Sequence, residues 1–418
     1  MAMAKMRIGI FGTLRGASYA HIFAGLENVE VTAVCDNNKR SLGNVQSIID
    51  KGAVAFNNFD DFINSGLMDA VMLCNYFTEH APYAVKAMEK GIHVLTECTP
   101  ALTMAECVLL CRTVEKTGCK YMLAENYPFF ACNMEMKRRF DKGYLGKALF
   151  CEGEYNHPVT THDQNMLAPG KYHWRNWLPR SYYLTHALAP ILCITGSELK
   201  SVNSKSVFAP AAMEGTASQV GDLVAIMLCE MKDGSLARVT GCAAWGGHGN
   251  WYRICGEKGN MQNVPGSLDQ IRVHYNGWQI PEGEQEVQTV PAKWYEDDEM
   301  NDRARNAGHA GGDYWCAYHF AKYVMEDEEP FFDVYRSVSM SATAIQALRS
   351  SMNGGAEYPI PDFRNEEERK LWENDHDSPF PDENGNATMP CCSHPDYRPT
   401  EEDYANAERE WREAGLIQ

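Results

Sequence analysis

The segment Arg7-Ile-Gly-Ile-Phe11, followed directly by Gly12-Thr-Leu-Arg-Gly16-Ala17, indicates how the first part of the chain folds. A short apolar, β-branched run that ends at a glycine and leads into a helical pattern predicts a strand, a tight turn and a helix. The turn is similar to the G-x-G-x-x-G pattern of dinucleotide sites, but Leu14 stands at the middle glycine position and Ala17 at the third. The helix would still offer free N–H groups to a pyrophosphate. We therefore expect a dinucleotide here, with an ordinary strand–helix turn as the alternative.

Strand and helix signals alternate outward from this segment as far as residue 125. The predicted strands are Arg7–Phe11, Val29–Cys35, Ala70–Leu73, His93–Thr96 and Tyr121–Leu123. The predicted helices are Ala17–Leu26, Lys39–Lys51, Glu79–Lys90 and Thr103–Thr117. This alternation predicts βαβ units and a parallel sheet, whose ligands bind at the carboxyl ends of the strands.

Polar residues at those strand ends are the candidates for cofactor contacts. Asp36 ends the second predicted strand, where a carboxylate can accept both ribose hydroxyls and would repel a 2′-phosphate. This favours NAD over NADP, with a helix N-cap as the alternative role of Asp36. Asn75, Glu97 and Glu125 follow three of the other strands.

The composition excludes several classes of protein. The 418 residues carry 38 Lys and Arg against 56 Asp and Glu, a formal net charge of −18, so we expect no nucleic-acid binding through a general basic surface. No apolar run approaches the roughly 18 residues of a membrane span. The first residues do not have the pattern of a secretion signal. The 15 cysteines include no C-x-x-C pair, which favours reduced thiols and a cytoplasmic location.

After residue 125 the pattern changes to longer strand-like runs with few helices between them. The predicted strands are Ala148–Tyr155, Ser201–Phe208, Asp222–Glu230, Ser235–Ala243 and Tyr252–Cys255, and the predicted helices are Cys132–Lys142, Trp315–Val324, Ser337–Met352 and Glu401–Ala414. We expect three consecutive parts, namely a dinucleotide-binding domain over 1–125, an α/β domain for substrate and oligomerisation over 126–363, and an acidic surface-wrapping tail over 364–418.

Several motifs, in order along residues 6–363, resemble those of the Gfo/Idh/MocA family, the glucose–fructose oxidoreductase and inositol dehydrogenase type. They are the segment from Met72 to His80, Gly91-Ile-His-Val-Leu-Thr-Glu97, Gly308-His-Ala-Gly-Gly-Asp313, Phe332-Asp-Val-Tyr335 and Pro361-Asp-Phe363. The resemblance implies an α/β fold: an N-terminal Rossmann NAD-binding domain plus a C-terminal domain with a large open, mostly antiparallel sheet. It also implies a homodimer or homotetramer formed through that sheet.

The chain departs from the ordinary dehydrogenases of this family at two motifs. Where they carry E-K-P, whose lysine assists proton transfer, this chain has Glu97-Cys98-Thr99-Pro100. A cysteine cannot supply that cation. In the family's D-x-x-x-H motif, His186 takes the histidine position, but Tyr182 stands in place of the aspartate. The standard lysine–histidine arrangement for alcohol oxidation is therefore incomplete.

Glycoside hydrolase family 109, a branch of the same family, also lacks that lysine and reads E-V-P-A-A at this point. This chain resembles the branch in four more segments: Met122-Leu-Ala-Glu-Asn126-Tyr127, Glu152-Gly-Glu-Tyr155, His173-Trp-Arg175 and Tyr183-Leu-Thr-His186-Ala-Leu-Ala-Pro190. The resemblance implies an active site made of Glu125, Tyr155, Tyr183 and His186. Leu184, Ala187 and Ala189 depart from the branch, as does a shorter stretch between Tyr155 and Tyr183, and these departures concern the sugar.

What the resemblance implies is an NAD-dependent enzyme that oxidises C3 of a glycoside. The cycle would be redox-neutral: oxidation, elimination, hydration and reduction. Tyr155 and Tyr183/His186 would form the base and acid pair, and Glu125 would orient the nicotinamide ring or a sugar hydroxyl. A sugar 3-dehydrogenase with net turnover is the alternative, and a non-catalytic NAD-binding regulator is a third hypothesis. Core packing is the structural alternative for each aromatic residue.

The remaining candidates complete the predicted site. Residues expected to bind the cofactor are Gly12, Thr13, Leu14, Arg15, Asp36, Asn75, His80, Glu97, Cys98, Asn126, Trp174 and Arg175. The last two would also suit a sugar, as an aromatic face beside a hydroxyl-binding fork. His248, in a glycine-rich loop that includes Trp245, and His309 are expected to contact substrate. We expect no metal, because the spacing of His157, His162 and Asp163 matches no standard ligand set.

Overall fold

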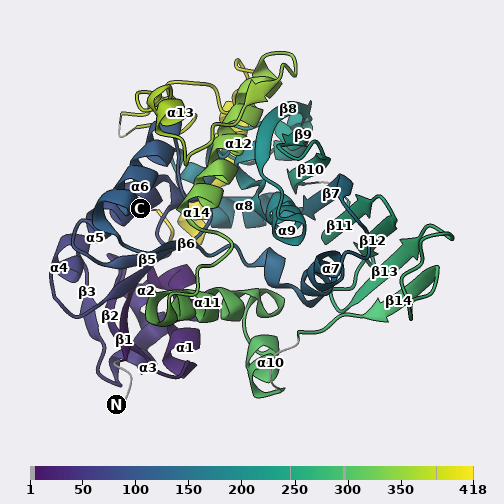
Figure 1. Cartoon of the computed structure of the whole chain (residues 1–418). Coiled ribbons are helices and arrows are strands. Elements are labelled where there is room, and N and C mark those ends of the chain that lie inside the picture. The colour runs from purple at the N-terminus through teal and green to yellow at the C-terminus, as the bar shows by residue number, and fades with distance from the viewer. Residues whose placement is uncertain (1–4, 245, 295–297, 383, 418) are drawn as a thin grey trace. The chain divides into compact units, whose positions relative to one another are not determined.

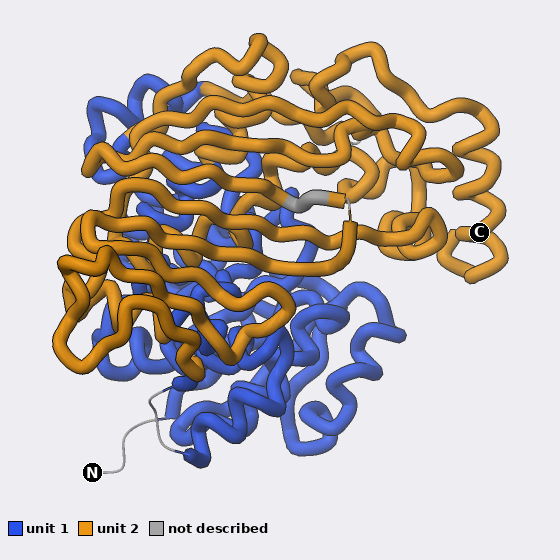
Figure 2. Tube along the Cα trace, turned by 90° about the vertical axis from the view of Figure 1, so that its right-hand side faces the viewer, with its two compact units in different colours: residues 1–134, 293–341, 362–374 blue, residues 135–292, 342–361, 375–418 orange. Residues whose placement is uncertain are grey.

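The computed structural model describes residues 5–244, 246–294, 298–382 and 384–417. The chain forms two compact units, shown in different colours in Figure 2. Unit 1 contains residues 1–134, 293–341 and 362–374, and unit 2 contains residues 135–292, 342–361 and 375–418. Each unit is built on one sheet. Trp245 lies outside the described residues.

Unit 1 is built on a six-stranded sheet in the order β3-β2-β1-β4-β5-β6, in which every pair of neighbouring strands is parallel. The strands are β1 (Met6–Phe11), β2 (Val29–Cys35), β3 (Val54–Phe56), β4 (Ala70–Leu73), β5 (His93–Thr96) and β6 (Tyr121–Leu123). The five predicted strands are therefore confirmed. The sequence prediction missed β3, which has only three residues, none of them fully buried.

The helices of unit 1 connect these strands or follow the second sheet in the chain. They are α1 (Thr13–Gly25), α2 (Lys39–Leu42), α3 (Gln46–Ile49), α4 (Phe59–Ile63), α5 (His80–Met88), α6 (Met104–Thr117), α10 (Asp298–Arg305), α11 (Gly312–Glu326) and α13 (Glu366–Lys370). The single helix predicted over Lys39–Lys51 is wrong, because a 3-10 turn at Gly43–Val45 separates α2 from α3.

The core of unit 1 explains why a late segment of the chain joins it. α1 and α11 pack together (Figure 1), and Cys316, Ala317 and Phe320 of α11 are buried in the same apolar cluster as Ile8 of β1 and Tyr19 of α1. The unit is thus not a consecutive block of sequence. Residues 293–341, which lie within the predicted second domain, complete the core that β1 and α1 begin.

Unit 2 is built on a nine-stranded sheet in the order β14-β13-β12-β11-β7-β10-β9-β8-β15. The strands are β7 (Ala148–Asn156), β8 (Leu199–Phe208), β9 (Asp222–Met231), β10 (Leu236–Ala243), β11 (Gly249–Gly256), β12 (Gly259–Asn263), β13 (Gln270–Tyr275), β14 (Val287–Pro291) and β15 (Tyr358–Pro359). Only β7 and β10 pair in parallel, so the expected mostly antiparallel sheet is confirmed.

Three helices belong wholly to unit 2: α8 (Thr161–Leu167), α9 (Thr185–Thr195) and α14 (Glu401–Glu413). Two further helices, α7 (Ala131–Asp141) and α12 (Val334–Met352), contain residues of both units. The prediction missed α9, because ten of its residues are buried and the helix has no polar face to produce a helical period in the sequence. α9 packs on β7, β10 and β11 and carries His186.

Candidate functional site

Gly12 makes the turn between β1 and α1 possible. Its φ of +85° lies in the left-handed region, and a Cβ there would come within 2.6 Å of the Cys74 backbone, so only glycine fits. Gly16, one turn later, lets α1 pack closely on β1, since a Cβ would lie 2.7 Å from Ile10. Leu14 is 77% exposed and directs its side chain to solvent. The close packing that a dinucleotide turn needs is present without the middle glycine.

Asp36 follows β2 and is tied to the same turn. Its Oδ2 accepts hydrogen bonds from the Thr13 N–H at 2.7 Å and the Thr13 hydroxyl at 3.0 Å, and its Oδ1 accepts from the Asn38 N–H at 2.8 Å. The cap of α2 is Asn38, so the alternative of Asp36 as an N-cap is wrong. A carboxylate has about four acceptor positions. Asp36 is therefore held in place by Thr13 and keeps capacity for a ribose hydroxyl.

Two amide side chains present buried acceptors at the carboxyl ends of β4 and β6. Oδ1 of Asn75 and Oδ1 of Asn126 are buried and receive no hydrogen bond from the residues that the structure describes. Buried acceptors in folded proteins normally have a donor. These two oxygens therefore suit a ligand that carries N–H or O–H groups. With the α1 N-terminus and Asp36 they fit NAD, whose ribose hydroxyls and carboxamide are such donors.

Arg15 forms the centre of a charged cluster in unit 1. Its Nε lies 2.7 Å from Oε1 of Glu97, and its two terminal nitrogens donate to Asp313 at 2.8 Å each. Asp313 is fully buried and also lies within hydrogen-bond distance of Nδ2 of Asn126 at 2.8 Å and Nδ1 of His309 at 3.0 Å. The cluster ties the dinucleotide turn to the first turn of α11.

The electrostatics of this cluster favour a fixed ion pair. Burial alone would raise the pKa of Asp313, but hydrogen bonds from His309 and Arg15, together with the charge of Arg15, hold that pKa well below its usual range. Asp313 therefore stays ionised and Arg15 stays paired. Direct contact of Arg15 or His309 with a ligand stays a prediction.

His80, at the start of α5, contacts two of the loops that follow strands. Its Nδ1 lies 2.9 Å from the carbonyl oxygen of Thr99, and its Nε2 lies 3.2 Å from that of Asn75. Burial lowers the pKa of His80 to about 4, although both carbonyl oxygens favour the charged ring. A neutral His80 has one N–H, so it donates to the carbonyl oxygen of only one of these two loops. Its contact with the cofactor stays a prediction.

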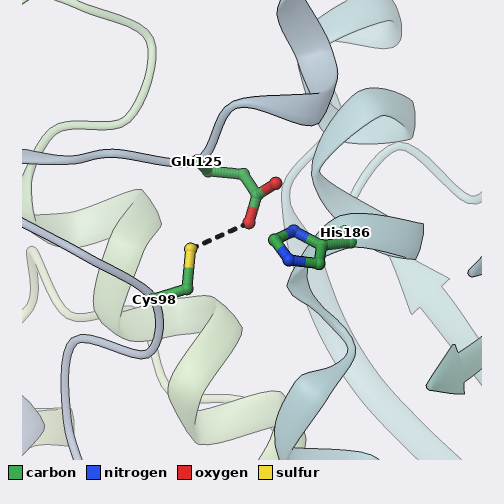
Figure 3. Close-up of side chains that lie close together, drawn as sticks. All are labelled: Cys98, Glu125 and His186. Atoms are coloured by element: carbon green, nitrogen blue, oxygen red, sulfur yellow. Dashed lines mark hydrogen bonds between the residues drawn. The ribbon is translucent and has the colours of Figure 1, made fainter. Parts of the chain in front are cut away.

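Cys98 and Glu125 form a close pair at the ends of β5 and β6, drawn in Figure 3. The Cys98 thiol donates to Oε2 of Glu125 at 3.0 Å, and Oε1 of Glu125 accepts from the Tyr127 N–H at 3.3 Å. Glu125 is fully buried, whereas Cys98 is partly exposed. The position that holds a lysine in ordinary dehydrogenases here supplies a neutral donor to a buried carboxylate.

In unit 2, the structure brings together three of the predicted catalytic residues. The ring centroids of Tyr155, at the end of β7, and Tyr183 lie 5.9 Å apart, and each ring meets the His186 ring nearly at a right angle, at 4.9 and 5.0 Å. Tyr155 and His186 are buried. The His157 ring lies 4.6 Å from the His248 ring and 5.7 Å from that of Tyr155. Two phenols and three imidazoles, all able to exchange protons, therefore lie close together in this unit.

Burial and the neighbouring His248 lower the pKa of His157, so the neutral form of this ring is favoured. A neutral imidazole can accept a proton or a hydrogen bond from a hydroxyl. His157 was considered only with His162 and Asp163. His162 lies 3.3 Å from Glu410, and Asp163 accepts a hydrogen bond from the Thr160 hydroxyl at the start of α8.

Trp174 and Arg175 lie in unit 2, in a 3-10 turn over Trp174–Asn176. The guanidinium carbon of Arg175 lies 4.3 Å from the centre of the Trp174 ring. The His173 ring also stacks with the Trp174 ring, with the ring centroids 5.8 Å apart. A stacked guanidinium beside an aromatic face suits a polyhydroxylated ligand. A role for these two residues in cofactor binding stays a prediction.

Sequence reasoning missed two residues that hold the site. Asp313 ends the motif that begins at Gly308 but is not among the predicted site residues. The one signal for it is an acidic residue in the first turn of a helix, a position that favours negative charge. Tyr252 was taken only as the start of a strand. Its hydroxyl donates to the backbone carbonyl of His186 at 2.7 Å, and no local sequence pattern predicts a contact between residues this far apart in the chain.

With this geometry in place, comparison with known proteins identifies the class. Residues 6–125 match the family model described as "Oxidoreductase family, NAD-binding Rossmann fold", and residues 250–370 match that described as "Glycosyl hydrolase 109, C-terminal domain". The fold is therefore that of an NAD-binding oxidoreductase. The chain belongs to the Gfo/Idh/MocA family, in its family 109 branch.

Whole-length relatives agree with this assignment. A "Glycosyl hydrolase family 109 protein" of Saccharopolyspora erythraea is 25% identical over 91% of this chain and 88% of its own length. An "Alpha-N-acetylgalactosaminidase" of Shewanella oneidensis is 24% identical over 89% of this chain and 87% of its own length.

Solved structures share the fold at low sequence identity. Levoglucosan dehydrogenase, in complex with NADH and levoglucosan, has a TM-score of 0.72 and 15% identity over 85% of this chain and 100% of its own. An NAD-binding oxidoreductase from Klebsiella pneumoniae has a TM-score of 0.70 and 13% identity over 85% of this chain and 99% of its own. No helix in the described ranges is long and apolar enough to cross a membrane.

Proposed function

We propose that this protein processes glycosides by oxidising C3 of the sugar with NAD, in a redox-neutral cycle that cleaves the glycosidic bond. The observation that carries the proposal is the group of Tyr155, Tyr183 and His186 rings in unit 2, with centroids 4.9–5.9 Å apart. The dinucleotide turn, Asp36 and the buried acceptors of Asn75 and Asn126 in unit 1 support the cofactor.

The chemistry sets what these residues must do. When bound, NAD accepts a hydride from C3 and later returns it to the same carbon. While C3 is a ketone, the proton on C2 is acidic, and a base can remove it as the C1–oxygen bond to the aglycone breaks. Water then adds at C1, a proton returns to C2, and reduction of C3 restores the sugar. Protons and electrons balance over the cycle, and the net reaction is hydrolysis.

The proposed roles follow from proton-exchanging groups held side by side. Tyr155 and Tyr183/His186 form the base and acid pair that exchanges the C2 proton and protonates the leaving oxygen. An unperturbed tyrosine has a pKa near 10, so a neighbouring imidazole is a suitable partner to take its proton. Glu125, fixed by Cys98 and the Tyr127 N–H, orients the nicotinamide ring or a sugar hydroxyl. Trp174, Arg175, His248 and His309 are proposed to contact the sugar or the cofactor.

A panel of p-nitrophenyl glycosides tests the proposal. The name of the Shewanella oneidensis relative makes the α-N-acetylgalactosaminide the first compound to try. We expect catalytic phenol release with NAD present, no accumulation of NADH, and deuterium from heavy water at C2 of the product. Accumulation of one NADH per turnover without phenol would instead identify a sugar 3-dehydrogenase. If no glycoside is turned over, the hypothesis of a non-catalytic NAD-binding regulator is favoured instead.

The choice of NAD over NADP rests on Asp36. Its carboxylate is fixed by Thr13 at the end of β2, where a 2′-phosphate would meet its charge. Calorimetry should therefore give tighter binding of NAD than of NADP, and Asp36→Ser should narrow the difference. Tighter binding of NADP by the unchanged protein would refute this role of Asp36.

The apolar face of the unit 2 sheet supports a homodimer or homotetramer. Four exposed apolar side chains lie on one face of three neighbouring strands of this sheet, β8, β9 and β10: Val207, Ile226, Leu228 and Leu236. Contiguous exposed apolar surface of this kind typically marks an interface. Light scattering should show an oligomer that Ile226→Glu weakens, and a monomer at micromolar concentration would contradict the proposal.

A cytoplasmic location is supported by the thiols. The cysteines whose side chains the structure describes form no disulfide, and most of them are buried. Thiol titration of protein from a reducing compartment should recover these cysteines as thiols after unfolding.

A further inference from the structure

α9, which carries His186, packs closely on the sheet of unit 2 because the two strands beneath its start have glycines at the contact points. A Cβ on Gly153 of β7 would lie only 2.0 Å from the carbonyl oxygen of Ala187, and a Cβ on Gly241 of β10 would lie 3.4 Å from the Cα of Leu184. The backbone of the helix start therefore rests directly on these two strands (Figure 1). The start of α9 therefore cannot move closer to the sheet.

Pro190 removes one hydrogen bond from the middle of α9. In an α-helix, the N–H of residue 190 would donate to the carbonyl oxygen of residue 186. Proline has no N–H, and its ring displaces that carbonyl from the helical ladder. The residue whose carbonyl loses its helical donor is His186, the proposed acid–base group.

Tyr252 supplies a donor to that carbonyl. Its hydroxyl lies 2.7 Å from the His186 carbonyl oxygen, and its side chain is fully buried. Tyr252 stands on β11 directly opposite Gly153 of β7, so its ring has room to reach α9. Its own backbone N–H donates to Oδ1 of Asn263 at 2.8 Å, which fixes the strand that carries it.

We propose that Tyr252 is a positioning residue for His186: by replacing the helical donor that Pro190 lacks, it sets the angle at which the imidazole faces Tyr155 and Tyr183. This inference rests on the proposed function in assigning His186 a proton-transfer role. The geometry of the ring cluster, with His186 nearly perpendicular to both phenol rings, is what the bond maintains.

The kinetic experiment is a double-mutant cycle. Tyr252→Phe removes one hydroxyl and should lower kcat about 10-fold with little change in KM, because a misplaced acid–base group loses rate rather than binding. Pro190→Ala restores an N–H that can donate to the His186 carbonyl. In that background, Tyr252→Phe should lower kcat less than about 3-fold. Equal losses in both backgrounds would overturn the proposal.

Tyr275→Phe is the matched control. Tyr275 is buried on β13 of the same sheet, and its hydroxyl lies 3.4 Å from Arg139 and from Glu284 instead of contacting α9. It should lower the melting temperature at most and leave kcat unchanged. A Tyr252→Phe variant that behaves like this control would show that Tyr252 is only structural.

A second readout needs no turnover. In protein labelled on the ring carbons of its 13 histidines, the His186 signal is identified by its loss in His186→Asn. We expect that signal to shift or broaden in Tyr252→Phe and to recover in the Pro190→Ala, Tyr252→Phe double variant. An unchanged His186 signal refutes the proposal even if the enzyme is active. If no glycoside reacts, the proposed function fails, and this measurement still decides whether Tyr252 positions His186.

Discussion

The two units hold their candidate site residues by different means. In unit 1, buried charges fix one another: Arg15 lies between Glu97 and Asp313, and Asp313 has Asn126 and His309 around it. In unit 2, ring faces and edges and one backbone bond position Tyr155, Tyr183 and His186. The difference indicates that unit 1 provides a rigid frame for a cofactor, whereas unit 2 groups phenol and imidazole rings, which are able to exchange protons.

Removal of a proton-transferring hydroxyl in unit 2 should have the largest effect. Tyr155→Phe keeps the ring and its packing on His186, so folding should be preserved. If the hydroxyl transfers a proton, the rate should fall on the order of 10²–10⁴-fold. Steady-state kinetics on the best p-nitrophenyl glycoside measure this, with Tyr275→Phe as the control. A Tyr155→Phe variant with full activity would remove Tyr155 from the mechanism.

Neutralising the buried carboxylate in unit 1 should affect stability instead. Asp313→Asn leaves Arg15 with only Glu97 and should reduce the free energy of unfolding by about 3 kcal/mol, as expected when one partner of a buried ion pair is lost. Asp69→Asn is the matched control, because the Arg7–Asp69 pair is more than 40% exposed and should contribute less than about 1 kcal/mol. Urea unfolding measures both. Equal losses would mean that burial adds nothing to the cluster.

His80 makes the stability of unit 1 depend on pH. The unfolded histidine has a pKa near 6.5 and the folded one has a pKa of about 4, so the unfolded chain binds the proton more tightly between these values. Stability is therefore complete above pH 6.5 and falls as the pH decreases towards 4, by up to about 1.4 kcal/mol per pH unit. His80→Gln should remove this part of the slope in urea titrations at pH 6.5 and 5.5. An unchanged slope in His80→Gln would contradict this prediction.

Cys98→Ala should have the smallest effect. The thiol donates one weak hydrogen bond to Glu125, whose other oxygen keeps the Tyr127 N–H. The variant should retain most of its activity, within about 3-fold, because the only interaction removed is one neutral hydrogen bond, a small contribution. A loss comparable to that of Tyr155→Phe would mean that Cys98 takes part in proton transfer. Proton-exchanging groups would then not be confined to unit 2.

Local patterns predicted unit 1 well because its determinants lie close together in sequence. The apolar strand, Gly12 and the first turn of α1 form one continuous segment, and Asp36 stands at the next strand end. Contacts between distant segments were not predictable in the same way. Neither Arg15 nor Asp313 indicates its partner, which is almost 300 residues away in the chain.

In unit 2, the motifs named Tyr155, Tyr183 and His186, whose rings lie close together, but the element that carries His186 was not predicted. α9 is apolar on every side and contains Pro190, so it shows neither an amphipathic period nor an uninterrupted helical composition. The short strands from β12 to β14 were missed as well. β14 is exposed or half-exposed along its whole length, and its alternation lacks large buried side chains.

The position of α11 has a consequence for synthesis on the ribosome. Residues 5–134 leave the ribosome first, but Cys316, Ala317 and Phe320, which fill the core over β1 and α1, follow much later. At about 5–20 residues per second, synthesis from residue 134 to residue 326 takes on the order of 10 to 40 s. Throughout that interval the nascent nucleotide-binding unit exposes the apolar surface that α11 later covers. The amino-terminal part of this chain therefore has to stay unaggregated without that cover until α11 emerges.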